Sequence, residues 1–210
     1  MKYTQKFLFA LSIFNLFLSS TVDAQPWNFI KEKDGIKIYT RTDPHSSLKS
    51  YKGETVFKAP MEKVCALLGT AKNLDWWDKG FTKIEVLKHE DQKFIQYYFI
   101  YDMPWPVVDR DLAVESRIKM DTASGIYTVS SRPLLKTVPE KPGLVRITKY
   151  WQKWTVKPME KGNLHVTIEG SIDPGGKIPD WVYNMLVTEM PLNTVRSLRN
   201  RALSPNPPTK

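Results

Sequence analysis

Most of the chain after residue 33 alternates between hydrophobic and polar positions, the pattern of β-strands with one buried face. The segment 163–172 shows it most cleanly, because Leu164, Val166 and Ile168 alternate with polar residues. The segment 93–101 is hydrophobic at both sets of alternating positions, so we expect a central strand covered on both faces. The predicted strands span residues 34–42, 50–59, 81–89, 93–101, 110–120, 125–132, 144–158 and 163–172.

Two segments show helical spacing instead. The first begins at Pro60, whose fixed φ suits the first turn of a helix, and ends near Gly69. The second, 180–203, places apolar side chains between Trp181 and Val195 along one stripe. Short turns between consecutive strands predict antiparallel pairing, and a sheet of about eight strands curves. We therefore expect an α+β fold in which a curved antiparallel sheet wraps around the long C-terminal helix.

The segment YDMPWPVVDRD, residues 101–111, interrupts the alternation between two predicted strands. Proline cannot donate a hydrogen bond to a strand ladder, so Pro104 and Pro106 predict that the chain leaves the sheet here. The two prolines enclose Trp105, and Arg110 follows between two aspartates. We expect a rigid apolar elbow that ends in a charged trio.

The first 24 residues have the features of a secretory signal peptide. Lys2 and Lys6 precede an apolar run, 7–18, that is too short to span a membrane, and Ala24 ends a suitable cleavage site. We therefore expect residues 1–24 to be removed and the protein to be exported to the periplasm or the extracellular space. An uncut N-terminal anchor helix is the alternative.

The remaining chain predicts one domain, 25–203, followed by a disordered tail, 204–210. The whole chain carries a formal charge of +9, and loss of the leader's two lysines and one aspartate lowers it to +8. Because the basic residues are scattered, we interpret most of them as a solvated surface. The single cysteine, Cys65, excludes an intrachain disulfide and fits a buried core position. We expect a monomer that contacts a membrane surface only transiently, with three arginines available for docking if they face outward: Arg196, Arg199 and Arg201.

Sequence motifs for metal binding, catalysis and nucleic-acid recognition are absent. His45, His89 and His165 are scattered, and the sequence has no HExxH motif and no cysteine pair, so we expect no metal and no cofactor. No GxSxG elbow is present. The DPGGK segment, 173–177, lacks the spacing of a phosphate-binding loop, so we interpret it as a strand-to-helix turn. We also expect no nucleic-acid partner.

The chain resembles START domains, the lipid-transfer domains related to the steroidogenic acute regulatory protein, within the helix-grip superfamily. The likeness covers roughly residues 27–203. It implies a helix-grip fold with an internal hydrophobic cavity that holds one lipid or sterol, and members that mostly bind or carry lipids and are not enzymes. The segments that carry it are DGIKIYTR (34–41), Trp76 or Trp77, MPWPVVDRD (103–111), Trp154, DPGGKIPDWVYN (173–184) and the closing helix.

The aromatic and methionine residues suit such a cavity, because ligand pockets are mostly apolar with a few placed polar groups. In the family the arginine that matches Arg110 faces the cavity and is usually paired with an acid, here Asp109, Asp111 or Glu169. Arg110 is therefore either a ligand contact or a salt bridge that fixes the elbow. The candidate wall residues are Trp76, Trp77, Tyr97, Phe99, Met103, Trp105, Met185, Leu186 and Met190.

Two functions follow from the resemblance. The first is a protein that binds a lipid or sterol-like molecule, with the closing helix and the elbow as its gate. Transfer of this molecule between membranes is an extension of the same function. The second is a cyclase- or hydrolase-like enzyme that acts on a hydrophobic substrate in the same cavity, with Arg110, Glu169 and His165 as candidates. The sequence shows no converging acid–base set, so we favour binding.

Overall fold

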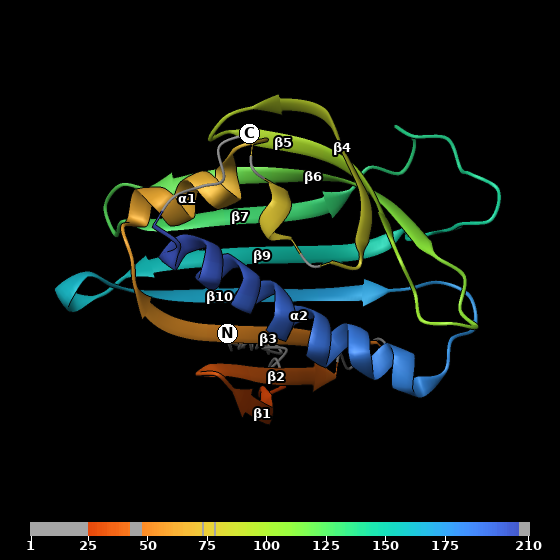
Figure 1. Ribbon diagram of the computed structural model, residues 1–210, viewed down its shortest axis with the longest axis horizontal. Helices are drawn as coiled ribbons and strands as arrows, with labels where there is room; N and C mark the ends of the chain where they lie inside the picture. Colours follow the sequence, from red (N-terminus) through yellow and green to blue (C-terminus); the bar gives the residue numbers. More distant parts are fainter. Residues whose placement is uncertain (1–24, 43–47, 73, 78, 206–210) are drawn as a thin grey trace, which may run out of the picture.

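The computed structural model describes residues 25–42, 48–72, 74–77 and 79–205, and one curved sheet dominates it (Figure 1). This described part contains ten strands. Their bounds are β1 (Asn28–Lys33), β2 (Ile36–Thr42), β3 (Lys49–Lys58), β4 (Phe81–Glu90), β5 (Phe94–Tyr101), β6 (Arg110–Asp121), β7 (Ile126–Pro133), β8 (Val145–Arg146), β9 (Lys149–Pro158) and β10 (Asn163–Asp173).

The strands lie in the order β1-β2-β3-β10-β9-β7-β6-β5-β4, and all neighbours along this path are antiparallel. The short β8 pairs in parallel with β6. The chain builds one edge with β1 to β3, crosses to the opposite edge at β4 and returns strand by strand to β3. The predicted antiparallel sheet is confirmed.

The helices lie on one side of this sheet. They are α1 (Met61–Gly69), the 3₁₀ turn η1 (Leu74–Trp76) and α2 (Asp180–Leu203), which runs diagonally across the strands (Figure 1). Both α helices start directly after a proline with extended backbone, Pro60 and Pro179. The predicted α+β helix-grip arrangement is confirmed. No helix in the described ranges is long and apolar enough to cross a membrane.

Alternation along the strands decides what the helix covers. The concave face carries most of the buried side chains, for example Ile38, Val166 and Ile168, and α2 adds Leu186 and Leu198 to the same core. Each such side chain contributes about 1.5–3 kcal/mol when fully buried. The sole cysteine is also buried, as predicted, and burial raises the pKa of its thiol to about 11.

Three sequence-based expectations need correction. The segment of β1 was not predicted as a strand, because almost all its residues are exposed and show no alternation. The strand expected over 144–158 is divided into β8 and β9. The segment of β5 is covered on both faces, as predicted, but it is not a central strand, because its neighbour β4 forms the edge of the sheet. On the outer face, Lys141 from the segment after β7 lies 4.3 Å from the ring centroid of Tyr98.

Some expectations fall outside the described residues. These are the leader, 1–24, the turn that contains His45, and residues 206–210 of the predicted tail.

Candidate ligand-binding site

A pocket lies between the concave face of the sheet and α2, toward the edge formed by β4 to β6. Its volume is about 90 Å³, below the roughly 300–1,000 Å³ of typical small-molecule sites. Most of its lining is aliphatic or aromatic. Eight predicted site residues line it: Trp76, Trp77, Tyr97, Phe99, Met103, Arg110, Leu186 and Met190.

The aromatic part of the wall is a set of edge-to-face contacts. The Trp77 ring lies 5.1 Å from that of Tyr97 and 6.0 Å from that of Phe99, and Trp76 lies 6.3 Å from Trp154. The indole N–H groups of Trp76 and Trp77 are buried without a hydrogen-bond partner in the described part of the chain. An unmet buried donor costs about 1–3 kcal/mol, so both are available to an acceptor.

Two predicted wall residues do not line the pocket. Trp105 is 89% exposed, because the Val107 amide donates to the Pro104 carbonyl at 3.0 Å and this turn carries Trp105 at its outer tip. Met185 is only partly buried, whereas its neighbour Leu186 points into the pocket. Adjacent helical positions differ by about 100° around the axis, so both cannot face the same space.

Arg110 is 3% exposed and lines the pocket at the end of the elbow. Its Nε donates to the Pro174 carbonyl at 3.1 Å and its Nη2 to the Gly175 carbonyl at 3.1 Å, while Nη1 donates to the Val108 carbonyl. The guanidinium therefore ties the elbow to the turn that precedes α2.

In the described part of the chain, none of the acidic residues predicted to pair with Arg110 forms a salt bridge with it. Asp109 accepts a bond from the Met103 amide at 3.0 Å, and Asp111 pairs with another arginine. Burial lowers the pKa of Arg110, and the nearby charge of Asp109 opposes this shift. Since a guanidinium has five N–H donors, donors remain for a ligand after the three backbone contacts.

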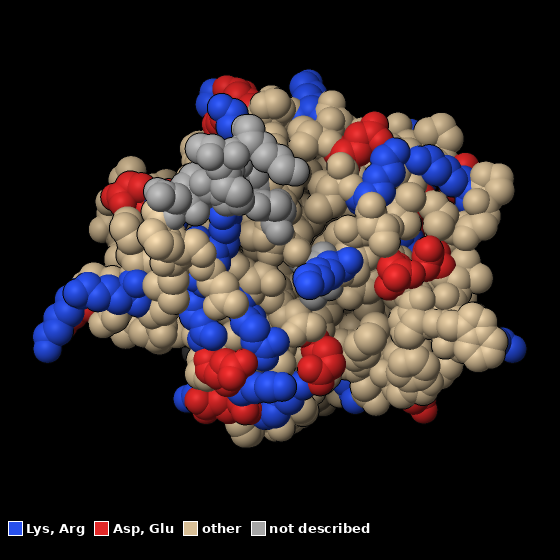
Figure 2. Space-filling view, viewed as in Figure 1, with Lys and Arg blue, Asp and Glu red and all other residues tan. Residues whose placement is uncertain are grey.

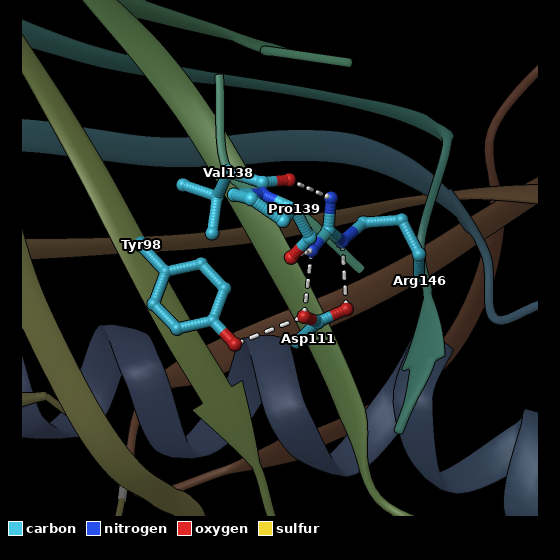
Figure 3. A network of polar contacts seen from close by, with 5 residues as sticks. All are labelled: Tyr98, Asp111, Val138, Pro139 and Arg146. Carbon is cyan, nitrogen blue, oxygen red and sulfur yellow. Dashed lines mark hydrogen bonds and ion pairs between the residues drawn. The ribbon is translucent and has the colours of Figure 1, made fainter. Parts of the chain in front are cut away.

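Asp111 belongs to a separate network on the outer face of the sheet (Figure 3). Its two carboxylate oxygens accept bonds from Arg146, from Nε at 2.7 Å and from Nη2 at 2.8 Å, and Tyr98 donates a third at 2.9 Å. Arg146 also donates to the carbonyls of Val138 and Pro139. Burial opposes the charged form of Asp111, but the bonds from Arg146 and Tyr98 lower its pKa overall.

The enzyme candidates do not converge. His165 and Glu169 point to the outer face of β10, where His165 Nε2 lies 3.4 Å from a carboxylate oxygen of Glu54. Among the described residues that line the pocket, none is Asp, Glu or His. Nor does any group of three or more His, Cys, Asp or Glu in the described ranges suit a metal ion.

The C-terminal arginines of α2 hold the edge of the sheet. Arg196 pairs with Asp34 at 2.9 Å, and Arg199 donates to the backbone carbonyl of Asp34. Lys31 and Glu189 form a further contact between β1 and α2. Figure 2 shows basic and acidic side chains side by side over this edge, not a stripe of one sign. Arg196 and Arg199 are therefore engaged within the fold.

Sequence reasoning missed the polar part of the pocket. Ser116, Ser131, Gln152 and Thr194 line it, together with apolar residues such as Leu112. The sequence did contain a signal for the two serines. Ser116 and Ser131 occupy positions of their strands that alternation assigns to the apolar, concave face.

Three comparisons place the chain among known proteins. The START domain model matches residues 14–204. An uncharacterized protein of Pseudomonas aeruginosa is 33% identical over 179 residues, 85% of this chain and 88% of that protein. The phosphatidylcholine transfer protein of Mus musculus is 28% identical over 164 residues, 75% of each chain. The solved fragment of the STAR-related lipid transfer protein of Xanthomonas axonopodis matches with a TM-score of 0.76 at 30% identity, over 85% of this chain and 99% of that one. The chain belongs to the START domain family.

Proposed function

We propose that the protein, as an exported monomer, binds a lipid or similar hydrophobic ligand in the pocket between the sheet and α2 and transfers it between membranes. The observation that carries this proposal is the lining, which is apolar and aromatic apart from a few polar groups and one buried arginine. Such a lining suits an amphipathic ligand. The names of the similar proteins, which describe lipid transfer, support the same interpretation.

Loading a lipid requires the walls to move apart, because the pocket holds only about 90 Å³ in this state. The elbow and the start of α2 are suited to this movement, since Arg110 connects them through hydrogen bonds to backbone carbonyls, which can break and re-form. Release of its bonds to Pro174 and Gly175 would free α2 from the elbow. We therefore assign these two elements the role of a gate.

Exposed apolar side chains support contact between this gate and a membrane surface. Trp105 and Val108 on the elbow are 89% and 51% exposed, and Trp181 in the first turn of α2 is 54% exposed. Tryptophan favours the interface between lipid and water. The apolar leader in residues 1–24 supports export, which would place this contact on a membrane outside the cytoplasm.

The enzyme alternative lacks support from the site, since His165 and Glu169 lie on the outer face.

Binding is tested by native mass spectrometry of the purified protein and by uptake of a fluorescent phospholipid from vesicles. We expect a co-purified or added lipid at one molecule per chain.

A matched pair of variants connects uptake to the pocket. Val129 lines the pocket, whereas Val56 is 52% exposed on the outer face of β3. Val129→Phe should fill the pocket and reduce uptake at least several-fold, and Val56→Phe should leave uptake unchanged. Overpacking costs about 1–3 kcal/mol, so thermal unfolding must confirm that both variants are folded. Equal uptake by both, or no uptake by the wild type, would contradict the proposal.

A further inference from the structure

The floor of the pocket contains one line of polar side chains that crosses three neighbouring strands. Ser116 on β6 is the register partner of Ser131 on β7, and Ser131 is the register partner of Gln152 on β9. All three line the pocket. We call these three residues the polar row.

Each side chain of the polar row takes part in a hydrogen bond. The hydroxyl oxygens of Ser116 and Ser131 lie 2.7 Å apart, and Gln152 Nε2 donates to the hydroxyl of Tyr51 at 3.2 Å. Tyr51 reaches Gln152 from β3 across β10 only because the residue between them is Gly170. A Cβ at this glycine would lie 2.4 Å from the Tyr51 hydroxyl oxygen. The backbone is therefore shaped to bring that hydroxyl to the row.

The lines of residues on both sides of the polar row are apolar or aromatic. On one side Ile118, Val129 and Trp154 are register partners, and on the other Tyr150 pairs with Ile172. Buried polar groups are costly unless they are hydrogen-bonded. Apolar packing alone would therefore not select polar residues at paired positions on three neighbouring strands. The row is a local exception within an apolar floor.

The polar row retains unused hydrogen-bonding capacity. The bond between Ser116 and Ser131 uses the hydrogen of only one of the two hydroxyls. The hydroxyl that accepts this bond can therefore still donate its own hydrogen. Gln152 lines the pocket, and its side-chain carbonyl forms no hydrogen bond with any described residue. The row thus offers a donor and an acceptor, both uncharged.

The charged group of the pocket lies far from this row. Arg110 and Ser116 are six positions apart on β6, which corresponds to roughly 20 Å along a strand. The stretch between them presents Leu112 and Val114 to the pocket. A ligand that fills the pocket from end to end would meet a cation, then an apolar segment, then uncharged polar groups.

We infer that the polar row binds a hydroxyl or carbonyl group of the ligand, and that the pocket takes an elongated amphiphile with an anionic head at Arg110. This inference rests on the proposed function and adds the chemical class of the ligand. The two positions are about 20 Å apart along the strand, so we expect the second polar group at a comparable distance from the head.

The test compares palmitate with its ω-hydroxy derivative, whose extended chain approaches this length. Displacement of the fluorescent probe 1-anilinonaphthalene-8-sulfonate measures the affinity of each. The wild type should prefer the hydroxylated acid by about threefold to tenfold, the effect of one net hydrogen bond. The same comparison with laurate, which is too short to reach the row, should show no preference for the hydroxyl.

Variants assign this preference to the row. Ser116→Ala/Ser131→Ala removes both hydroxyls at nearly constant volume and should abolish the preference while palmitate still binds. Ser130→Ala, on the exposed face of β7, is the matched control and should keep it.

A preference that survives in the double variant, or equal affinities in the wild type, would overturn the inference although lipid binding stands. If the wild type binds neither acid and takes up no phospholipid, the proposed function itself is wrong, and the inference with it. The chain-length comparison uses the wild type alone, so it remains decisive if the double variant does not fold.

Discussion

Arg110 and Asp111 are neighbours on β6, and their side chains lie on opposite faces of the sheet in different surroundings. On the outer face Asp111 meets Arg146 and Tyr98, so every charge has a partner. On the concave face Arg110 meets only backbone carbonyls in the described part of the chain. Both side chains are almost fully buried.

We interpret the charges of the outer network as structural and propose that the charge of Arg110 serves a ligand. A buried ion pair with all its hydrogen bonds met has no need of a ligand, and it fastens the segment after β7 to the sheet. A buried cation held by neutral oxygens is incompletely compensated, and it borders a pocket. The outer network should therefore control stability, and Arg110 should control binding.

The largest expected effect is on stability. Asp111→Asn leaves the buried Arg146 without its carboxylate, and breaking a buried pair costs about 3–5 kcal/mol. Denaturant unfolding should show this loss, while lipid uptake per folded molecule stays near the wild-type value. Asp111→Asn/Arg146→Met should lose less than the single variant, since the uncompensated charge is gone.

A surface pair provides the control for that experiment. Lys93 pairs with Glu90, and both side chains are more than half exposed. Glu90→Gln should cost no more than about 1 kcal/mol. If it costs as much as Asp111→Asn, burial does not explain the importance of the outer network.

The second effect falls on binding. Arg110→Met removes the cation and should weaken palmitate binding by on the order of tenfold or more, the contribution of a charged hydrogen bond. Stability should fall by about 1–3 kcal/mol, because the carbonyls of Pro174 and Gly175 lose their donor. Probe displacement and denaturant unfolding measure the two quantities. A variant that loses stability but binds palmitate normally would make Arg110 a structural residue like Arg146.

The third effect appears as pH falls. Because the folded pKa of Asp111 is below its ordinary value of 3.8, the network contributes its full stabilisation above that pH and loses it as pH falls toward the folded pKa. Unfolding free energy should therefore decrease more steeply below about pH 4 in the wild type than in Asp111→Asn. Parallel profiles for the two proteins would show that Asp111 titrates alike in the folded and unfolded states.

The smallest expected effect on stability concerns the elbow tip. Trp105 is 89% exposed, so Trp105→Ala should change unfolding free energy by no more than about 0.5 kcal/mol. The rate of lipid transfer from vesicles should fall, since the side chain is proposed to contact the membrane. Stopped-flow transfer assays measure this rate. An unchanged rate would limit the elbow to holding Arg110 in place.

Several features of the site could be predicted from local patterns in the chain. Alternation along β5 puts Tyr97 and Phe99 on one face, and both line the pocket. Proline chemistry marks the elbow, which does leave the sheet between β5 and β6. The same reasoning fails for Trp105, because periodicity does not extend into a turn and gives no direction to its side chains.

The sequence by itself determined the α+β class, the sheet faces and the long closing helix, because these depend on periodicities within a few residues. Only the tertiary structure decided which polar groups meet. Arg110 finds two of its three acceptors 64 and 65 residues later, at Pro174 and Gly175. The polar row forms because three strands pair in one register, which places Ser116, Ser131 and Gln152 side by side. Alternation sets the face of each side chain, but it is unchanged when a strand shifts by two residues, so it does not select which residues lie opposite one another.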